Sequence, residues 1–129
     1  MYESIFRNLP GNPAWVGSFY ERLAEDAVWD KEEFWKLHLA LIDAATQASG
    51  SVGKIDRELA WAVAKIQSRV LCLVASHYDP HDIFIIANLT SDELHQFIER
   101  FCNAILGVFS GEILAESSCD LRSPLIGDT

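Results

Sequence analysis

Residues 56–77, DRELAWAVAKIQSRVLCLVASH, decide the fold class of this 129-residue chain. One stripe of mostly apolar side chains recurs there at the three- and four-residue spacing of an α-helix. The stripe consists of Leu59, Val63, Ile66, Val70, Leu73 and His77. Because other apolar residues fill the remaining sides, we expect this helix to lie at the centre of a helical bundle, covered by its neighbours.

Capping residues predict the helices of the first half. Asn12, followed by a proline, offers a side-chain acceptor to a helix that we expect to run to about Ala27. Asp30 predicts the start of the next helix, because a glutamate follows three residues later and aromatic residues are placed for a hydrophobic staple. The small residues at 49–53 predict the turn that ends this helix.

Two further helix starts lie in the last third of the chain. The stretch 79–82, DPHD, predicts a short helix over residues 83–89, with a strand as the alternative. Thr90 and Glu93 form a capping box that predicts a helix ending near Gly107 and Gly111. Residues 1–116 are therefore expected to form one all-α domain, a bundle of about five helices around a central hydrophobic helix. The polar residues 117–129 are expected to form a loosely held tail.

Composition limits the partners and the compartment. The chain has 10 Lys and Arg against 19 Asp and Glu, a net charge of −9 that repels phosphate backbones and anionic lipid. We therefore expect no direct contact with nucleic acid or membranes. The three cysteines have no C-x-x-C spacing, and the first residues lack a basic stretch followed by an apolar run. These features predict a cytoplasmic protein without disulfides.

One motif suggests an enzyme. The doublet His81-Asp82 is similar to that of metal-dependent phosphohydrolases of the HD type, which are all-helical and add an earlier His and a later Asp. The candidates for these further metal ligands are His38 or His77, and Asp92 or Asp120. Helix capping explains the doublet more simply. We therefore predict a protein that is not an enzyme and holds no metal or cofactor, and we keep the HD type as an alternative.

The remaining reactive side chains favour structural roles. His38 and His77 lie on apolar stripes, where a hydrogen-bonded core histidine is commoner than a ligand. Cys72 and Cys102 have no basic neighbour at helical spacing that would clearly activate a thiolate, so both are expected to be small buried residues.

Negative charge is densest around the first connection between helices. The acidic residues there are Glu21, Glu25, Asp26, Asp30, Glu32 and Glu33, which we take as the candidate partner-binding site. Arg22, Lys31 and Lys36 compensate in part. One interpretation is a solvated face. The other is a docking surface for a basic protein, with nearby tryptophans as anchors or as core residues.

The acidic stretch 21–30, ERLAEDAVWD, and the aromatic-rich segments on either side resemble an immunity protein of a bacterial polymorphic-toxin system, for which the Maf type is one candidate. This resemblance implies a chain that binds a cognate toxin, often a basic nuclease, and blocks it. A further alternative is a helical regulatory or scaffold protein that forms a homodimer, because apolar stripes can be completed within one chain or across two.

Overall fold

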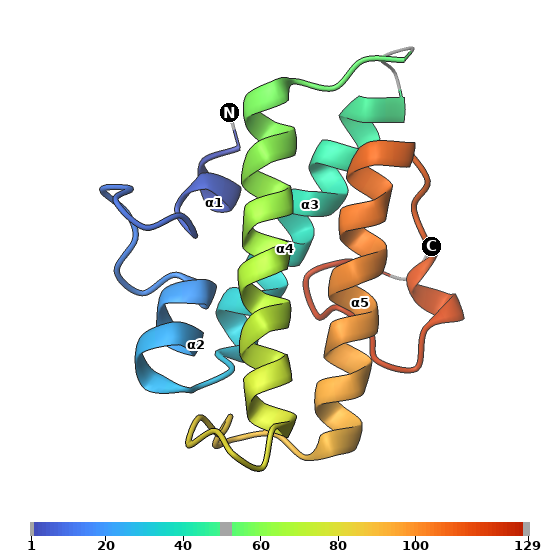
Figure 1. Cartoon of the computed structure of the whole chain (residues 1–129). Coiled ribbons are helices and arrows are strands. Elements are labelled where there is room, and N and C mark those ends of the chain that lie inside the picture. Colours follow the sequence, from blue (N-terminus) through green and yellow to red (C-terminus); the bar gives the residue numbers. More distant parts are fainter. Residues whose placement is uncertain (1, 50–52, 128–129) are drawn as a thin grey trace.

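A computed structural model describes residues 2–49 and 53–127 (Figure 1). These residues form helices and connecting segments, and no strand is found among them. The elements are α1 (Glu3–Phe6), α2 (Phe19–Asp26), α3 (Lys31–Ser49), α4 (Arg57–Tyr78), α5 (Ser91–Ser110) and the 3-10 turn η1 (Glu116–Ser118). The predicted all-α, single-domain bundle is therefore confirmed.

Helices α3 and α5 form the closest pair in the bundle. They run in the same direction, and α4 runs opposite to both (Figure 1). Lys31 Nζ lies 3.4 Å from Glu93 Oε2 and joins the starts of the two helices. Near their ends, a Cβ on Gly107 would lie 3.4 Å from the Ala45 side chain and 2.6 Å from the Glu112 carbonyl oxygen. Because glycine has no Cβ, both α3 and the chain that leaves α5 can pack closely against the backbone of Gly107.

Helix α4 confirms the helix predicted from residues 56–77, but the prediction that this helix lies at the centre of the bundle is wrong. Asp56 Oδ2 accepts a hydrogen bond from the Leu59 N–H at 3.1 Å and caps the helix. The helix packs against α1, α2 and α5 with one side and covers one face of the bundle. Its other side is open, since Trp61 is 57% exposed and Cys72 is exposed. The prediction failed because apolar residues occur on all sides of this helix in the sequence, a pattern that is also typical of a helix covered on every side.

By length and composition, α4 is also the one helix in the described part of the chain that could cross a membrane. Its most apolar window has a mean hydropathy of 1.3, and 28% of that window is buried in the bundle. A single helix of this kind is weak evidence for a membrane span, because helices of soluble proteins pass the same test. The arrangement of α4 is therefore compatible with a soluble protein.

The predicted starts of the later helices are confirmed by hydrogen bonds. The Thr90 side chain accepts from the Glu93 N–H at 3.1 Å and the Glu93 carboxylate accepts from the Thr90 N–H at 3.0 Å, so the capping box is present. Asp30 Oδ1 accepts from the Glu33 N–H at 3.1 Å at the start of α3. Gly111, with a φ of 78°, ends α5 in the left-handed conformation. The turn predicted at 49–53 lies partly outside the described residues.

The predicted start of the first long helix at Asn12 is wrong. Asn12 Oδ1 instead accepts from the Ala14 N–H in a local turn, at 2.8 Å. Gly17 has a φ of 84°, which interrupts any helix before it, and Ser18 caps α2 by accepting from the Glu21 N–H. Helix α2 therefore begins at Phe19 and ends at Asp26.

Residues 79–89 form neither the predicted helix nor the alternative strand; the chain there is a loop with turns. Asp79 and Asp82 accept from backbone N–H groups two residues later, which favours turns over helix. Contacts distant in sequence then fix the loop. Asn88 accepts from the Trp29 N–H at 2.9 Å and donates to the Trp29 carbonyl at 2.8 Å, and the Ala87 N–H donates to the Ala27 carbonyl.

Aromatic side chains fill the core between α2, α3 and α5. The Phe34 ring lies 5.4 Å from those of Phe19 and Trp29 and 5.0 Å from that of Phe97. The contact between Trp29 and Phe34 confirms the predicted staple. Such ring pairs contribute about 0.5–1.5 kcal/mol each beyond the burial of their area. Trp29 and Trp35 are thus core residues rather than surface anchors.

The C-terminal segment, expected to be loosely held from residue 117, makes specific contacts as far as it is described. Glu116 is buried and forms an ion pair with Arg100 of α5. The buried Ser123 donates its N–H to Glu116 Oε1 at 2.6 Å. The sequence did not indicate this contact, because the segment is polar and Arg100, the partner of Glu116, lies on another element.

Candidate functional site

The six predicted partner-binding carboxylates lie on α2, on the connection to α3 and on the first turn of α3. We call them together the acidic surface: Glu21, Glu25 and Asp26 on α2, Asp30 on the connection, and Glu32 and Glu33 on α3. A residue in the left-handed conformation, Ala27, turns the chain between the two helices. The turn brings the end of α2 beside the start of α3, so the six residues lie in one region of the surface.

Most carboxylates of the acidic surface have partners. Arg22 joins the two helices, with its guanidinium 3.3 Å from Asp26 and 3.0 Å from Asp30. Glu33 lies 3.2 Å from both Arg7 and Lys36. These ion pairs hold the carboxylates in place and reduce their net charge.

The other three members differ in their exposure to solvent. Glu21 accepts from the Gly17 N–H at 3.2 Å. Glu32 is exposed and lies 3.8 Å from Lys36. Glu25 is exposed and makes no ion pair with any residue that the structure describes. Glu25 and Glu32 are therefore the members freest to meet a partner.

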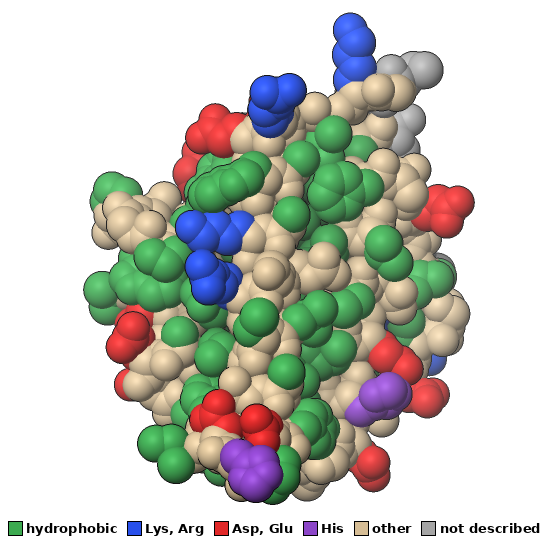
Figure 2. Space-filling view, in the orientation of Figure 1, with side chains coloured by type: hydrophobic (Ala, Val, Ile, Leu, Met, Phe, Trp, Pro, Cys, Tyr) green, Lys and Arg blue, Asp and Glu red, His purple; other side chains and the backbone are tan. Residues whose placement is uncertain are grey.

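Exposed apolar side chains border the acidic surface. Ile83 is 99% exposed and Ile85 54% exposed, on the loop that Asn88 ties to the connection between α2 and α3. Val16 is 80% exposed and directly precedes Gly17, the hydrogen-bond partner of Glu21. At the end of α4, Figure 2 shows acidic and hydrophobic side chains gathered together. The sequence alone did not indicate that these apolar residues are exposed, because their spacing predicted helices with buried faces.

The structure does not assemble the HD metal centre from the residues it describes. His81 and Asp82 are exposed in the loop after α4, whereas His38 is buried in the core. His77 Nδ1 accepts from the Ile86 N–H at 2.9 Å and holds that loop. Within residues 2–49 and 53–127, no group of three or more His, Cys, Asp or Glu side chains could hold a metal ion.

A buried ionic cluster, which the sequence analysis did not identify, lies between α3, α5 and the C-terminal segment. Arg100 pairs with Glu116, and its Nη1 lies 2.6 Å from Cys119 Sγ. His38 is buried close by, and its Nδ1 has no hydrogen-bond partner among the described residues. Burial, with a smaller contribution from the Arg100 charge, lowers the pKa of His38 to about 4. His38 is therefore a neutral core residue at physiological pH.

Two cysteines and one further histidine lie away from this cluster. Cys72 is exposed, which corrects the prediction that it is buried, and Cys102 is half-buried. Cys102 Sγ lies 3.8 Å from Gln67 Nε2, and all three cysteines are free thiols. His95 lies beside Glu99, 3.0 Å away on the exposed side of α5.

Comparison of this chain with protein-family models, with curated proteins and with solved structures finds no match.

Proposed function

We propose that this chain is a cytoplasmic immunity protein that binds a basic cognate toxin and neutralises it. The contact would be made by the acidic surface together with the neighbouring loop that carries Ile83 and Ile85. The observation that carries the proposal is the almost complete exposure of Ile83, 99%, on a loop hydrogen-bonded to the connection between α2 and α3. The proposal does not require a catalytic group.

An exposed isoleucine pair in such surroundings is typical of a binding surface. Protein interfaces combine apolar residues at the centre with a polar and charged rim. Here Ile83 and Ile85 supply apolar area, while Asp79, Asp82 and the acidic surface supply the charge. A basic partner would cover the isoleucines and meet carboxylates around them.

The ion pairs of the acidic surface support fast and selective docking. Arg22 and Arg7 hold Asp30 and Glu33 in fixed positions, so that less conformational entropy is lost when a partner binds. Complementary charge raises the rate of encounter and disfavours acidic partners. In a toxin that acts on nucleic acid, carboxylates in this arrangement would occupy the place of substrate phosphates.

The test starts from capture of the tagged chain with whatever binds it in native lysate, followed by growth assays of cells that express the captured protein. A toxin should arrest growth when expressed alone and should be harmless when expressed with the wild-type chain. The double variant Glu25→Lys/Glu32→Lys should slow association at least tenfold, and Ile83→Ser should speed dissociation, because exposed charge acts on encounter and apolar burial acts on residence time.

Matched controls separate the proposed surface from general charge or hydrophobicity. Asp43→Lys/Asp120→Lys makes the same change of charge at exposed positions outside the acidic surface, and Leu106→Ser removes an apolar side chain that is 61% exposed on α5. Both controls should keep wild-type association and protection. Equal losses in controls and test variants would contradict this surface. A stable homodimer that Ile83→Ser dissociates, with no toxin bound, would replace the proposal by self-association.

A further inference from the structure

The cations of α4 and of the segment before it differ from the other basic residues of the chain. Arg7, Arg22, Lys31, Lys36 and Arg100 each form an ion pair with a carboxylate. Within the described residues, no carboxylate pairs with Lys54, Arg57, Lys65 or Arg69. Acidic residues outnumber basic ones by 19 to 10, so cations without an ion pair are unexpected. Figure 2 shows basic side chains along one side of the face that α4 covers.

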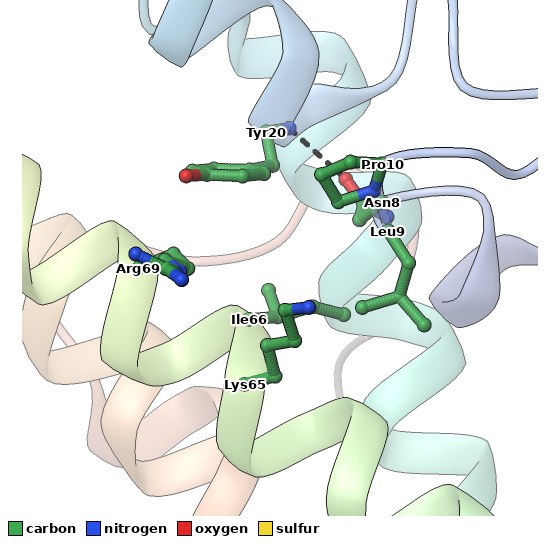
Figure 3. Close-up of a pocket in the computed structure, with 7 residues that line it drawn as sticks. All are labelled: Asn8, Leu9, Pro10, Tyr20, Lys65, Ile66 and Arg69. Atoms are coloured by element: carbon green, nitrogen blue, oxygen red, sulfur yellow. Dashed lines mark hydrogen bonds between the residues drawn. The ribbon is translucent and has the colours of Figure 1, made fainter.

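Two of these cations line a pocket between α4, α2 and the segment that follows α1. The pocket is open to solvent and has a volume of about 180 Å³. Its walls are formed by Asn8, Leu9, Pro10, Tyr20, Lys65, Ile66 and Arg69 (Figure 3). Lys65 and Arg69 lie one helical turn apart and contribute the only formal charges of the lining.

The polar groups of the pocket divide into those already used and those available. Asn8 is used, because its Nδ2 donates to the Ser4 carbonyl and its Oδ1 accepts from the Tyr20 N–H (Figure 3). Asn8 thereby fixes the rim of the pocket against α2. Lys65 Nζ lies over the Trp61 ring, 4.8 Å from its centroid, and forms no hydrogen bond with any residue that the structure describes, so its N–H groups that do not face the ring can donate to a ligand. The Arg69 guanidinium likewise forms no hydrogen bond with a described residue, so its donors are available.

The remaining walls are apolar and aromatic. Leu9, Pro10 and Ile66 form one side, and the Tyr20 ring lies opposite Arg69 (Figure 3). Burial raises the pKa of Tyr20 further above its ordinary value; the hydroxyl of a tyrosine is protonated at neutral pH in either case and can donate to an anion. The volume lies below the range of about 300–1,000 Å³ typical of pockets for drug-sized ligands, which favours a small ligand.

We propose that this pocket binds a small organic anion, a carboxylate or a phosphate monoester with a compact apolar body. The anionic group would accept from Lys65 and Arg69, and the apolar body would pack on Leu9, Pro10 and Ile66. Arginine suits this role because its planar fork of donors matches both carboxylate and phosphate. None of the six carboxylates of the acidic surface takes part, so the pocket goes beyond the proposed toxin contact.

Titration of the full chain with phenyl phosphate, followed by NMR of backbone amides, tests the proposal. Saturable shifts confined to the amides of residues 8, 9, 20 and 65–69 are expected, with a dissociation constant of about 1–10 mM or tighter. Inorganic phosphate and benzyl alcohol, which carry only the charge or only the apolar body, should each bind at least fivefold more weakly. Arg69→Gln and Lys65→Gln should each weaken phenyl phosphate binding about tenfold.

Arg57→Gln is the matched control, because it removes the same charge from the same helix outside the pocket. Its effect on phenyl phosphate should stay below twofold. An equal loss in all three variants would reveal diffuse charge attraction and overturn the proposal. An affinity for inorganic phosphate equal to that for phenyl phosphate would overturn the proposal that the ligand has an apolar body. Tighter binding of a decaglutamate peptide that depends on Arg57 would identify α4 as a protein-docking face instead. None of these outcomes affects the toxin assay.

Discussion

Arg100 on α5 and Arg69 on α4 are arginines in opposite surroundings. Arg100 is 5% exposed, pairs with Glu116 and contacts Cys119. Arg69 is exposed on α4, in the wall of the pocket beside α2, and has no ion pair among the described residues. The first holds the C-terminal segment to the bundle, whereas the second is available to a ligand. The two arginines therefore differ in whether a carboxylate already uses the charge: Glu116 holds that of Arg100, whereas no described carboxylate holds that of Arg69.

The acidic surface lies between these two extremes. Arg22 and Glu33 each bridge two partners, but the pairs lie at the surface, where an ion pair contributes about 0.2–1 kcal/mol to stability. Their value lies in fixing the positions of carboxylates.

The largest effect is expected from Glu116→Gln. This change leaves the Arg100 guanidinium buried without its anion, which typically costs about 3–5 kcal/mol of the free energy of unfolding. Chemical denaturation of the variant and the wild type measures the difference. Glu112→Gln, at an exposed position nearby, should change stability by less than about 0.5 kcal/mol. The double variant Arg100→Met/Glu116→Leu should recover most of the loss, because it removes both charges.

A loss below about 1 kcal/mol in Glu116→Gln would contradict the structural role of this pair and weaken the contrast with Arg69.

The parts of the fold that were predicted correctly depend on neighbours in sequence. The capping box of Thr90 and Glu93 and the cap at Asp56 form within one helical turn, so their residues are visible together in the sequence. The acidic surface was predicted as a group for the same reason. Its six members fall within 13 residues of each other, and the turn between α2 and α3 keeps them close.

The parts that were missed depend on contacts distant in sequence. Asn88 meets the backbone of Trp29 across 59 positions and fixes a loop in place of a helix. The pairing of Arg100 with Glu116 and the pocket beside Tyr20 likewise require tertiary packing. The periodicity of the sequence predicted which stripe of α4 is buried, but it does not determine how many sides of the helix pack against other elements.

The second effect concerns His38, which shares the buried region with Arg100. Its folded pKa of about 4 lies below the unfolded value of 6.5. The unfolded state therefore binds more protons between these values, and stability is lost as pH falls from 6.5 to 4. The shift corresponds to a loss of about 3 kcal/mol over the whole window and about 2 kcal/mol by pH 5.

Denaturation at pH 7 and pH 5 measures this effect as a difference between variants. His38→Gln or His38→Phe should lose less stability than the wild type over that interval, since the replacement does not titrate there. His81→Gln, at an exposed position, should retain the wild-type dependence. Equal pH dependence in all of them would show that His38 is protonated as readily in the folded chain as in the unfolded one.

The smallest effect on stability is expected when the same substitution, arginine to glutamine, is made separately at a paired and at an unpaired surface arginine. Arg22→Gln removes ion pairs to Asp26 and Asp30 and should cost about 0.5–1 kcal/mol of stability. Arg69→Gln removes no ion pair with any described residue and should stay within about 0.5 kcal/mol of the wild type. Denaturation at low and high salt distinguishes the two, because screening should reduce only the Arg22 effect. A salt-sensitive loss in Arg69→Gln as large as that in Arg22→Gln would mean that Arg69 stabilises the fold, and the free cations of α4 would no longer be a sign of a ligand.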